Sequence, residues 1–84
     1  MNTQSNTPVD TIRDGSLKAT IWMNQRENGK AYSVQITRSY KDDQGNWRDT
    51  DSFSGSELLR VARLANVAYD EVLIHRANDK AGSQ

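Results

Sequence analysis

Apolar and polar residues alternate along two stretches in the first half of the chain. From Ser16 to Met23 the odd-numbered side chains are apolar, and Ala31 to Tyr40 alternates in the same way. A period of two is typical of a strand with one buried face. The pair Asn28-Gly29 lies between the two stretches and is a strong signal for a tight hairpin turn. The pattern therefore predicts an antiparallel hairpin.

A two-residue loop at Asn28-Gly29 determines the register that we expect in this hairpin. Met23 then faces Val34, and Ile21 faces Ile36. Apolar positions meet apolar positions and polar positions meet polar ones, so neither strand needs to slip. The hairpin is expected to have one apolar face and one polar face.

A second turn, rich in turn-forming residues, follows at residues 43–46, and residues 47–53 return as a third strand. With a four-residue loop, Asp51 lies opposite Arg38, which is a modest cross-strand contact. A short additional strand over residues 11–13 would make the sheet four-stranded. The expected sheet is a β-meander of three or four antiparallel strands.

A long helix is expected after the sheet. Ser54 and Glu57 have the spacing of a capping box, and no proline interrupts the chain from residue 55 or 56 to residue 74 or 76. The face predicted to lie on the sheet consists of Leu58, Val61, Ala62, Ala65, Ala68, Tyr69, Val72 and Leu73. The fold class is therefore α+β, with one C-terminal helix closing the sheet.

Other apolar residues of the helix lie away from that face, namely Leu59, Leu64, Val67 and Ile74. A helix that packs only on its own sheet does not need them. One interpretation is that they form a dimer interface with a second copy. The other is that they are scattered apolar residues of the kind found on most protein surfaces.

The length of 84 residues allows one domain, expected at residues 11–77, with unstructured polar tails at residues 1–10 and 78–84. So small a core favours self-association. The chain has no cysteine, which excludes disulfides and thiolate metal sites, and no apolar run that could cross a membrane. We therefore expect a cytoplasmic protein. Its 11 basic and 11 acidic residues argue against a strongly basic nucleic-acid binder.

The polar face of the predicted sheet carries no Asp or Glu within the strands. It combines basic, hydroxyl and amide side chains with a tryptophan, which suits single-stranded DNA or RNA because cations neutralise phosphates and aromatic rings stack on bases. A solvated outer face is the ordinary alternative. The candidate nucleic-acid-binding residues are Lys18, Trp22, Lys41 and Arg48, and the path could be extended by Tyr32, Tyr40, Arg26 and Lys30.

The sequence offers little for catalysis or cofactors. The only histidine, His75, lies near the end of the predicted helix, where an interaction with the helix C-terminus is expected rather than a metal. There is no nucleophile elbow and no glycine-rich phosphate loop. The acidic residues around the second turn lack the spacing of a calcium loop. We expect no enzyme activity, no metal, no cofactor and no small-molecule substrate.

Residues 40–48, YKDDQGNWR, join the second and third predicted strands. An aromatic residue, an acidic glycine turn and then a basic residue, followed by a strand and one long helix, resemble the positive cofactor four family of single-stranded-DNA-binding transcriptional coactivators. The resemblance covers about residues 16–75. The stretch SYKDDQGNWRDTDSFSGSELL is also similar to small uncharacterised bacterial and mobile-element proteins.

The resemblance implies a homodimer that binds single strands, as an accessory factor in transcription or DNA maintenance. It places Tyr40 at a base-stacking position and Arg48 at a phosphate-contacting one. Two features depart from the family. Residues 49–51 are Asp-Thr-Asp, where the family has a glycine-rich basic stretch, and residues 1–10 contain no Lys or Arg. The main alternative is a protein-interaction module that uses its helix face.

Overall fold

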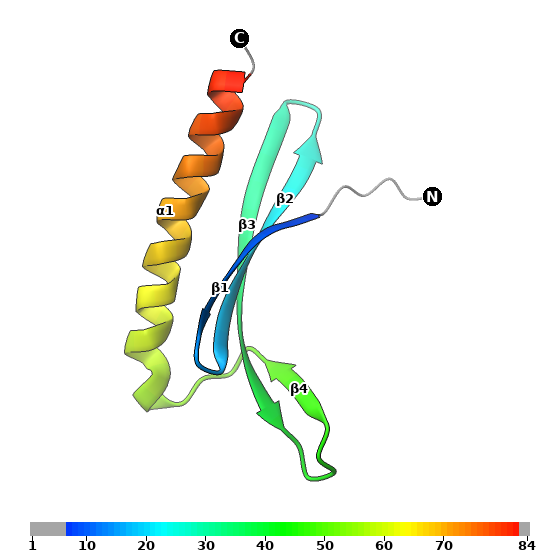
Figure 1. Cartoon of the computed structure of the whole chain (residues 1–84), viewed down its shortest axis with the longest axis vertical. Coiled ribbons are helices and arrows are strands. Elements are labelled where there is room, and N and C mark those ends of the chain that lie inside the picture. The colour runs from blue at the N-terminus through cyan, green and yellow to red at the C-terminus, as the bar shows by residue number, and fades with distance from the viewer. Residues whose placement is uncertain (1–6, 83–84) are drawn as a thin grey trace.

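The computed structural model describes residues 7–82 as one antiparallel sheet with a helix along one side (Figure 1). This confirms the expected α+β class. The strands pair in the order β1-β2-β3-β4. A single 3-10 turn, Gly55–Glu57, leads into the helix. The elements are β1 (Thr7–Asp14), β2 (Leu17–Arg26), β3 (Gly29–Lys41), β4 (Trp47–Thr50) and α1 (Leu58–Gly82).

Regular structure extends into both segments that were expected to be unstructured tails. β1 begins at Thr7 and takes the place of the short extra strand expected at residues 11–13. α1 continues to Gly82, beyond the expected end of the domain at residue 77. Residues 1–6 and 83–84 lie outside the described part of the chain. No helix within the described part is long and apolar enough to cross a membrane.

The first hairpin forms, but with a register two residues away from the expected one. Arg26 pairs with Gly29, so the loop is Glu27-Asn28 rather than Asn28-Gly29. Gly29 has a φ of 125°, and no other residue type has a positive φ between residues 7 and 82. Asn28 therefore does not adopt the conformation that the expected turn requires. A shift of two residues leaves every side chain on its expected face.

The second hairpin differs from expectation by one residue, because its loop is longer. Arg38 pairs with Thr50 instead of Asp51. Asp42 belongs to the loop: its N–H donates to the carbonyl of Asn46, and its Oδ1 accepts N–H groups of Gln44 and Asn46 at 2.9 Å each. A shift of one residue moves every β4 side chain to the opposite face from the expected one.

The core lies between α1 and the sheet. It consists of alternate β2 residues, Leu17, Ala19 and Ile21, together with Leu64 and Ala68 of α1, all at most 1% exposed. Leu64 was expected at a dimer interface, and that assignment is wrong. Burying a leucine side chain contributes roughly 1.5–3 kcal/mol, and Leu64 makes that contribution within the single chain.

The helix is rotated relative to its expected orientation. Val61, Leu64, Ala68 and Val72 pack on the sheet, at helical spacings of three or four. Both sides of this helix carry apolar residues, so periodicity alone did not select between them. Five residues expected to face the sheet are exposed instead, and we call them the helix stripe: Leu58, Ala62, Ala65, Tyr69 and Leu73.

Polar contacts tie the start of the helix to the sheet. The Ser54 N–H donates to Glu57 Oε1 at 2.9 Å, which is the glutamate half of the expected capping box. Arg60 Nη2 lies 3.0 Å from both the carbonyl oxygen and Oδ1 of Asp14. The turn after Asp14 uses Gly15, with a φ of 62°, and a Cβ at Gly15 would lie 2.6 Å from the Arg60 guanidinium. The glycine therefore makes room for this contact.

Candidate nucleic-acid interface

The face of the sheet turned away from α1 is formed by the strand residues that alternate with the core. Lys18, Thr20 and Trp22 alternate with the buried residues of β2, and side chains directly across the ladder share their face. We call this the outer sheet face. It comprises Thr11, Arg13, Lys18, Thr20, Trp22, Asn24, Arg26, Ala31, Ser33, Gln35, Thr37, Ser39, Lys41, Trp47 and Asp49.

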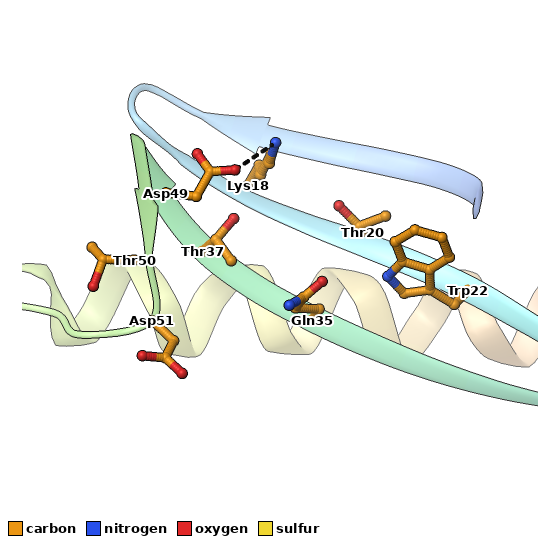
Figure 2. Close-up of a pocket in the computed structure, with 8 residues that line it drawn as sticks. All are labelled: Lys18, Thr20, Trp22, Gln35, Thr37, Asp49, Thr50 and Asp51. Carbon is orange, nitrogen blue, oxygen red and sulfur yellow. Dashed lines mark ion pairs between the residues drawn. The ribbon is translucent and has the colours of Figure 1, made fainter. Parts of the chain in front are cut away.

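An open hollow of about 510 Å³ lies on this face, at the end where β4 joins the sheet (Figure 2). Thr37 contributes to its floor and is only 9% exposed, and its Oγ1 has no hydrogen-bond partner within residues 7–82. A buried hydroxyl without a partner is unfavourable unless water or a ligand satisfies it. The hollow is lined by Lys18, Thr20, Trp22, Gln35, Thr37, Asp49, Thr50 and Asp51.

Two carboxylates lie beside this hollow, contrary to the expectation that this face carries none. The shift in the β3–β4 register brings Asp49 next to Lys18, with 3.5 Å between Nζ and Oδ2 (Figure 2). Ser39 donates its hydroxyl to the other oxygen of Asp49 at 3.0 Å. Asp51 follows at the edge of the hollow. The positive charge of Lys18, which was expected to contact phosphate, is therefore partly neutralised by Asp49.

Arg48 lies on the face opposite Lys18 because of the one-residue shift, and Tyr40 lies on that same face because it alternates with Ser39 and Lys41 along β3. The Arg48 Nε lies 2.7 Å from Asp42 Oδ2, so an ion pair joins β4 to the β3–β4 loop. This hydrogen bond, helped by the N–H groups of Asn46 and Gln44, lowers the pKa of Asp42 below its usual value. The Tyr40 ring lies 5.7 Å from the guanidinium carbon of Arg38 on the same strand. Neither Arg48 nor Tyr40 joins the outer sheet face.

The same shift places Trp47 on the outer sheet face, where the sequence analysis had not placed it. Lys41 is its cross-strand partner, and the Lys41 Nζ lies 5.4 Å from the centroid of the indole ring. Trp47 is 69% exposed. The outer face therefore carries two tryptophans, Trp22 and Trp47. Only knowledge of the loop length could have predicted the second one.

The outer sheet face also carries two arginines. Arg13 lies directly across from Lys18 because β1 is a full strand, and the sequence analysis missed it. Arg26 was expected in the loop as an extension of the path, and it instead ends β2 in the outward-facing row. Both are exposed.

Lys30 lies on the helix side of the sheet, at the end distant from β4. Its Nζ lies 3.4 Å from Asp79 Oδ1 of α1. The Tyr32 hydroxyl also donates to Asp79, and this hydrogen bond is the main cause that raises the pKa of Tyr32 to about 12. The Tyr32 ring stacks on His75, with centroids 5.6 Å apart. Lys30 therefore fastens β3 to α1 and does not extend the nucleic-acid path.

The four residues expected at a dimer interface do not form one exposed surface. Leu64 is buried and Val67 is half-buried, while Leu59 and Ile74 are 84% and 52% exposed. The exposed apolar surface is instead richest along the helix stripe, where Leu58 is 56%, Tyr69 60% and Leu73 41% exposed.

One group of side chains has the composition of a metal site, formed by Asp10 of β1 with Glu71 and His75 of α1.

Comparisons of the chain with protein-family models, with curated proteins and with solved structures gave no match.

Proposed function

We propose that this protein binds single-stranded nucleic acid on its outer sheet face, with little sequence preference, as a homodimer. The observation that carries the proposal is the grouping, on one uncovered face, of two tryptophans with four cationic residues. The cationic residues are Arg13, Lys18, Arg26 and Lys41, and the carboxylates on or beside the same face are Asp49 and Asp51.

The chemistry of this face matches the two features that unpaired strands present. Cationic side chains neutralise phosphates and release counterions, while an exposed indole stacks on any base. Hydroxyl and amide groups such as those of Thr20 and Gln35 offer hydrogen bonds to sugars and base edges. The unpaired Thr37 hydroxyl at the floor of the hollow is a further group that a ligand would satisfy.

The carboxylates Asp49 and Asp51 limit the expected affinity. They repel phosphates, and Asp49 already neutralises part of the charge of Lys18. We therefore expect weak binding that falls steeply with salt. The resemblance of residues 40–48 to the positive cofactor four family supports the same class of ligand. Arg48, however, contacts Asp42 on the other face and is not part of the proposed site.

The homodimer is proposed from the helix stripe. Its residues recur every three or four positions, contain no charge and follow one side of α1 for four turns, as in helices that pack against one another. The core within one chain contains only five buried apolar residues among those described. Because small cores are marginally stable, packing the stripe against a second copy would add needed apolar burial.

A titration of a fluorescein-labelled oligothymidylate at low salt, followed by fluorescence anisotropy, tests the binding site. Arg13→Ala should weaken binding and make its salt dependence shallower, because Arg13 lies on the outer sheet face. Arg63→Ala is the matched control, since it removes the same charge from an exposed position of α1. Equal effects of the two substitutions, or no binding at high micromolar protein, would contradict the proposal.

A second candidate function is docking of a different protein on the helix, without nucleic-acid binding. The observation in its favour is Leu59, which is 84% exposed and lies outside the helix stripe. Sedimentation distinguishes the two possibilities in part. A tight dimer accounts for the stripe with a second copy, whereas a monomer that binds no oligonucleotide favours a different protein partner.

A further inference from the structure

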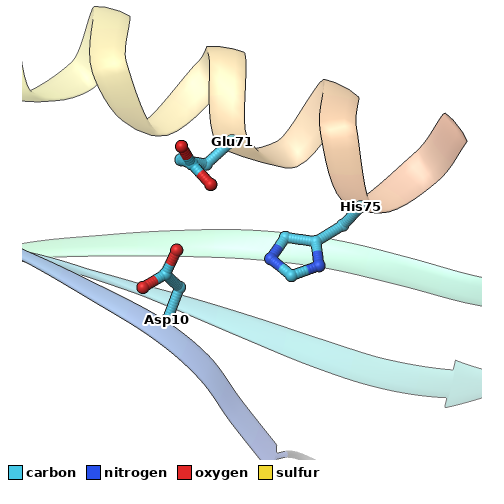
Figure 3. A group of neighbouring side chains, drawn as sticks. All are labelled: Asp10, Glu71 and His75. Atoms are coloured by element: carbon cyan, nitrogen blue, oxygen red, sulfur yellow. The ribbon is translucent and has the colours of Figure 1, made fainter. Parts of the chain in front are cut away.

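Asp10, Glu71 and His75 converge between β1 and α1, on the side of the sheet opposite the proposed nucleic-acid site (Figure 3). One carboxylate oxygen of each acid and one imidazole nitrogen all lie within 4.8 Å of one another. All three side chains are half-buried. Two carboxylates and an imidazole therefore share one small space that is partly shielded from water.

The fold holds these residues together for reasons that can be traced along the chain. Glu71 and His75 are four positions apart in α1, so they project from the same side of the helix. Asp10 lies opposite Ile21, a core residue, and therefore faces the helix. The β1–β2 register shifts between Pro8 and Asp10, as at a β-bulge, a feature that re-aims a side chain.

The charges in this cluster are not balanced by other groups of the protein. Asp10 and Glu71 form no ion pair within residues 7–82, although the chain forms five elsewhere in that range. Asp10 Oδ1 accepts the N–H of Thr11 at 2.9 Å, which leaves Oδ2 to face another partner. Two carboxylates this close repel each other in a half-buried site, and a cation between them would relieve that repulsion.

We propose that Asp10, Glu71 and His75 bind a divalent transition-metal ion of the zinc class. One imidazole nitrogen and two carboxylate oxygens are a common ligand set for Zn²⁺ and for Co²⁺ or Ni²⁺ in its place. Metal–ligand bonds of about 2.0–2.2 Å require the three donors to draw closer together by rotation of their side chains. Water completes the coordination.

The surroundings of His75 suit a ligand. Its ring stacks on Tyr32 at an interplanar angle of 25°, which fixes the orientation of the imidazole. Groups that orient a ligand histidine typically contribute substantially to metal affinity. The metal would join β1 to α1, two elements far apart in the sequence. It would stabilise the folded chain increasingly as the free metal concentration rises above the dissociation constant.

The test uses the full chain, freed of any affinity tag and of metal, and titrates it with Zn²⁺ alone by isothermal titration calorimetry. We expect one ion per chain with a micromolar dissociation constant, and a higher melting temperature in the presence of Zn²⁺. Because the chain has one histidine and no cysteine, perturbation of the His75 imidazole resonances by Zn²⁺ in NMR spectra locates the ion without any substitution.

Glu71→Gln and His75→Asn should each weaken Zn²⁺ binding at least tenfold. The matched control is Asp70→Asn, which removes one charge from the neighbouring exposed position and should leave binding unchanged. Circular dichroism of each variant verifies the fold. Absence of Zn²⁺ binding at millimolar metal, or binding that leaves the His75 resonances unperturbed, would overturn the proposal. Binding lost in Asp42→Asn but retained in Glu71→Gln would overturn it as well.

Discussion

Lys18 and Asp49 form an ion pair across β3, from strands that are not neighbours in the sheet, with 3.5 Å between Nζ and Oδ2. Their side chains are 26% and 50% exposed, so the pair is partly accessible to water. Exposed pairs contribute little to stability. The main effect of this pair is therefore on surface charge rather than on stability, because Asp49 reduces the positive charge that the outer sheet face presents.

Asp49→Asn is expected to strengthen binding of single-stranded DNA. It removes a charge that repels phosphates and releases Lys18 to contact them. An exposed charge interaction of about 0.5–1 kcal/mol corresponds to a two- to fivefold change in affinity. Fluorescence anisotropy at several salt concentrations measures this change. Asp43→Asn, in the exposed loop, is the control with the same change in net charge. Weaker binding by Asp49→Asn would mean that Asp49 positions Lys18 for the ligand.

Leu64→Ala is expected to destabilise the protein by about 2–5 kcal/mol, because it leaves a cavity between α1 and β2. Leu59→Ala, a substitution of the same size at a residue that is 84% exposed, should change the free energy of unfolding by less than about 0.5 kcal/mol. Urea unfolding followed by circular dichroism, at two or more protein concentrations, measures the free energy of unfolding of each variant. Similar effects for both leucines would indicate that Leu59 is buried in an assembly.

Leu73→Glu is expected to convert the proposed dimer to a monomer, because it places a charge in the helix stripe. Ile74→Glu is the control, since Ile74 is 52% exposed but lies about 100° further around the helix. Sedimentation velocity reports the molecular mass in each case. If Ile74→Glu dissociates the dimer and Leu73→Glu does not, the interface lies on the side of α1 that the sequence pattern first indicated.

The pKa of Asp14 is expected to lie below 3.8, because Arg60 donates a hydrogen bond to its carboxylate and adds a favourable charge interaction. A carboxyl group with a lower pKa in the folded state stabilises the protein above its unfolded pKa. The stabilisation is therefore lost as the pH falls below about 4. NMR titration of the Asp14 carboxyl measures the pKa directly.

Arg60→Ala should return the pKa of Asp14 towards 3.8 and reduce the loss of stability between about pH 4 and the depressed pKa. Arg76→Ala, near the other end of α1, is the control and should leave the titration of Asp14 unchanged. An unchanged Asp14 pKa in Arg60→Ala would show that the contact between the β1–β2 turn and the helix does not persist in solution.

The two hairpins show how far the sequence could predict this fold. The register of β2 and β3 was wrong by two residues, yet every side chain kept its face because side chains alternate with a period of two. The register of β4 was wrong by one residue, which reversed Arg48 and Asp49. Alternation determines the existence of strands, whereas loop length determines their pairing. The hydrogen bonds of Asp42 that lengthen the second loop are not visible in composition.

The helix shows a related limit. Its start followed from Ser54 and Glu57, but its end and its orientation did not. The helix continues to Gly82, and apolar residues occur on two of its sides. Only packing against the sheet, where Leu17 and Ile21 of β2 face the helix, selects Leu64 over Leu58 for burial. The Asp10, Glu71 and His75 cluster was missed for a similar reason. The four-residue spacing in the helix was visible, but the third residue comes from a distant strand.

β3 is much longer than the strand that borders it. It spans Gly29–Lys41, yet β4 pairs with it only from Arg38 to Lys41. Along residues 30–37, β2 occupies one edge of β3 and no strand within the described residues occupies the other. Alternate amide protons of this segment should therefore exchange with deuterium quickly, while those donated to β2 exchange slowly. Protection of the fast set on dimerisation would indicate that a second chain has continued the sheet.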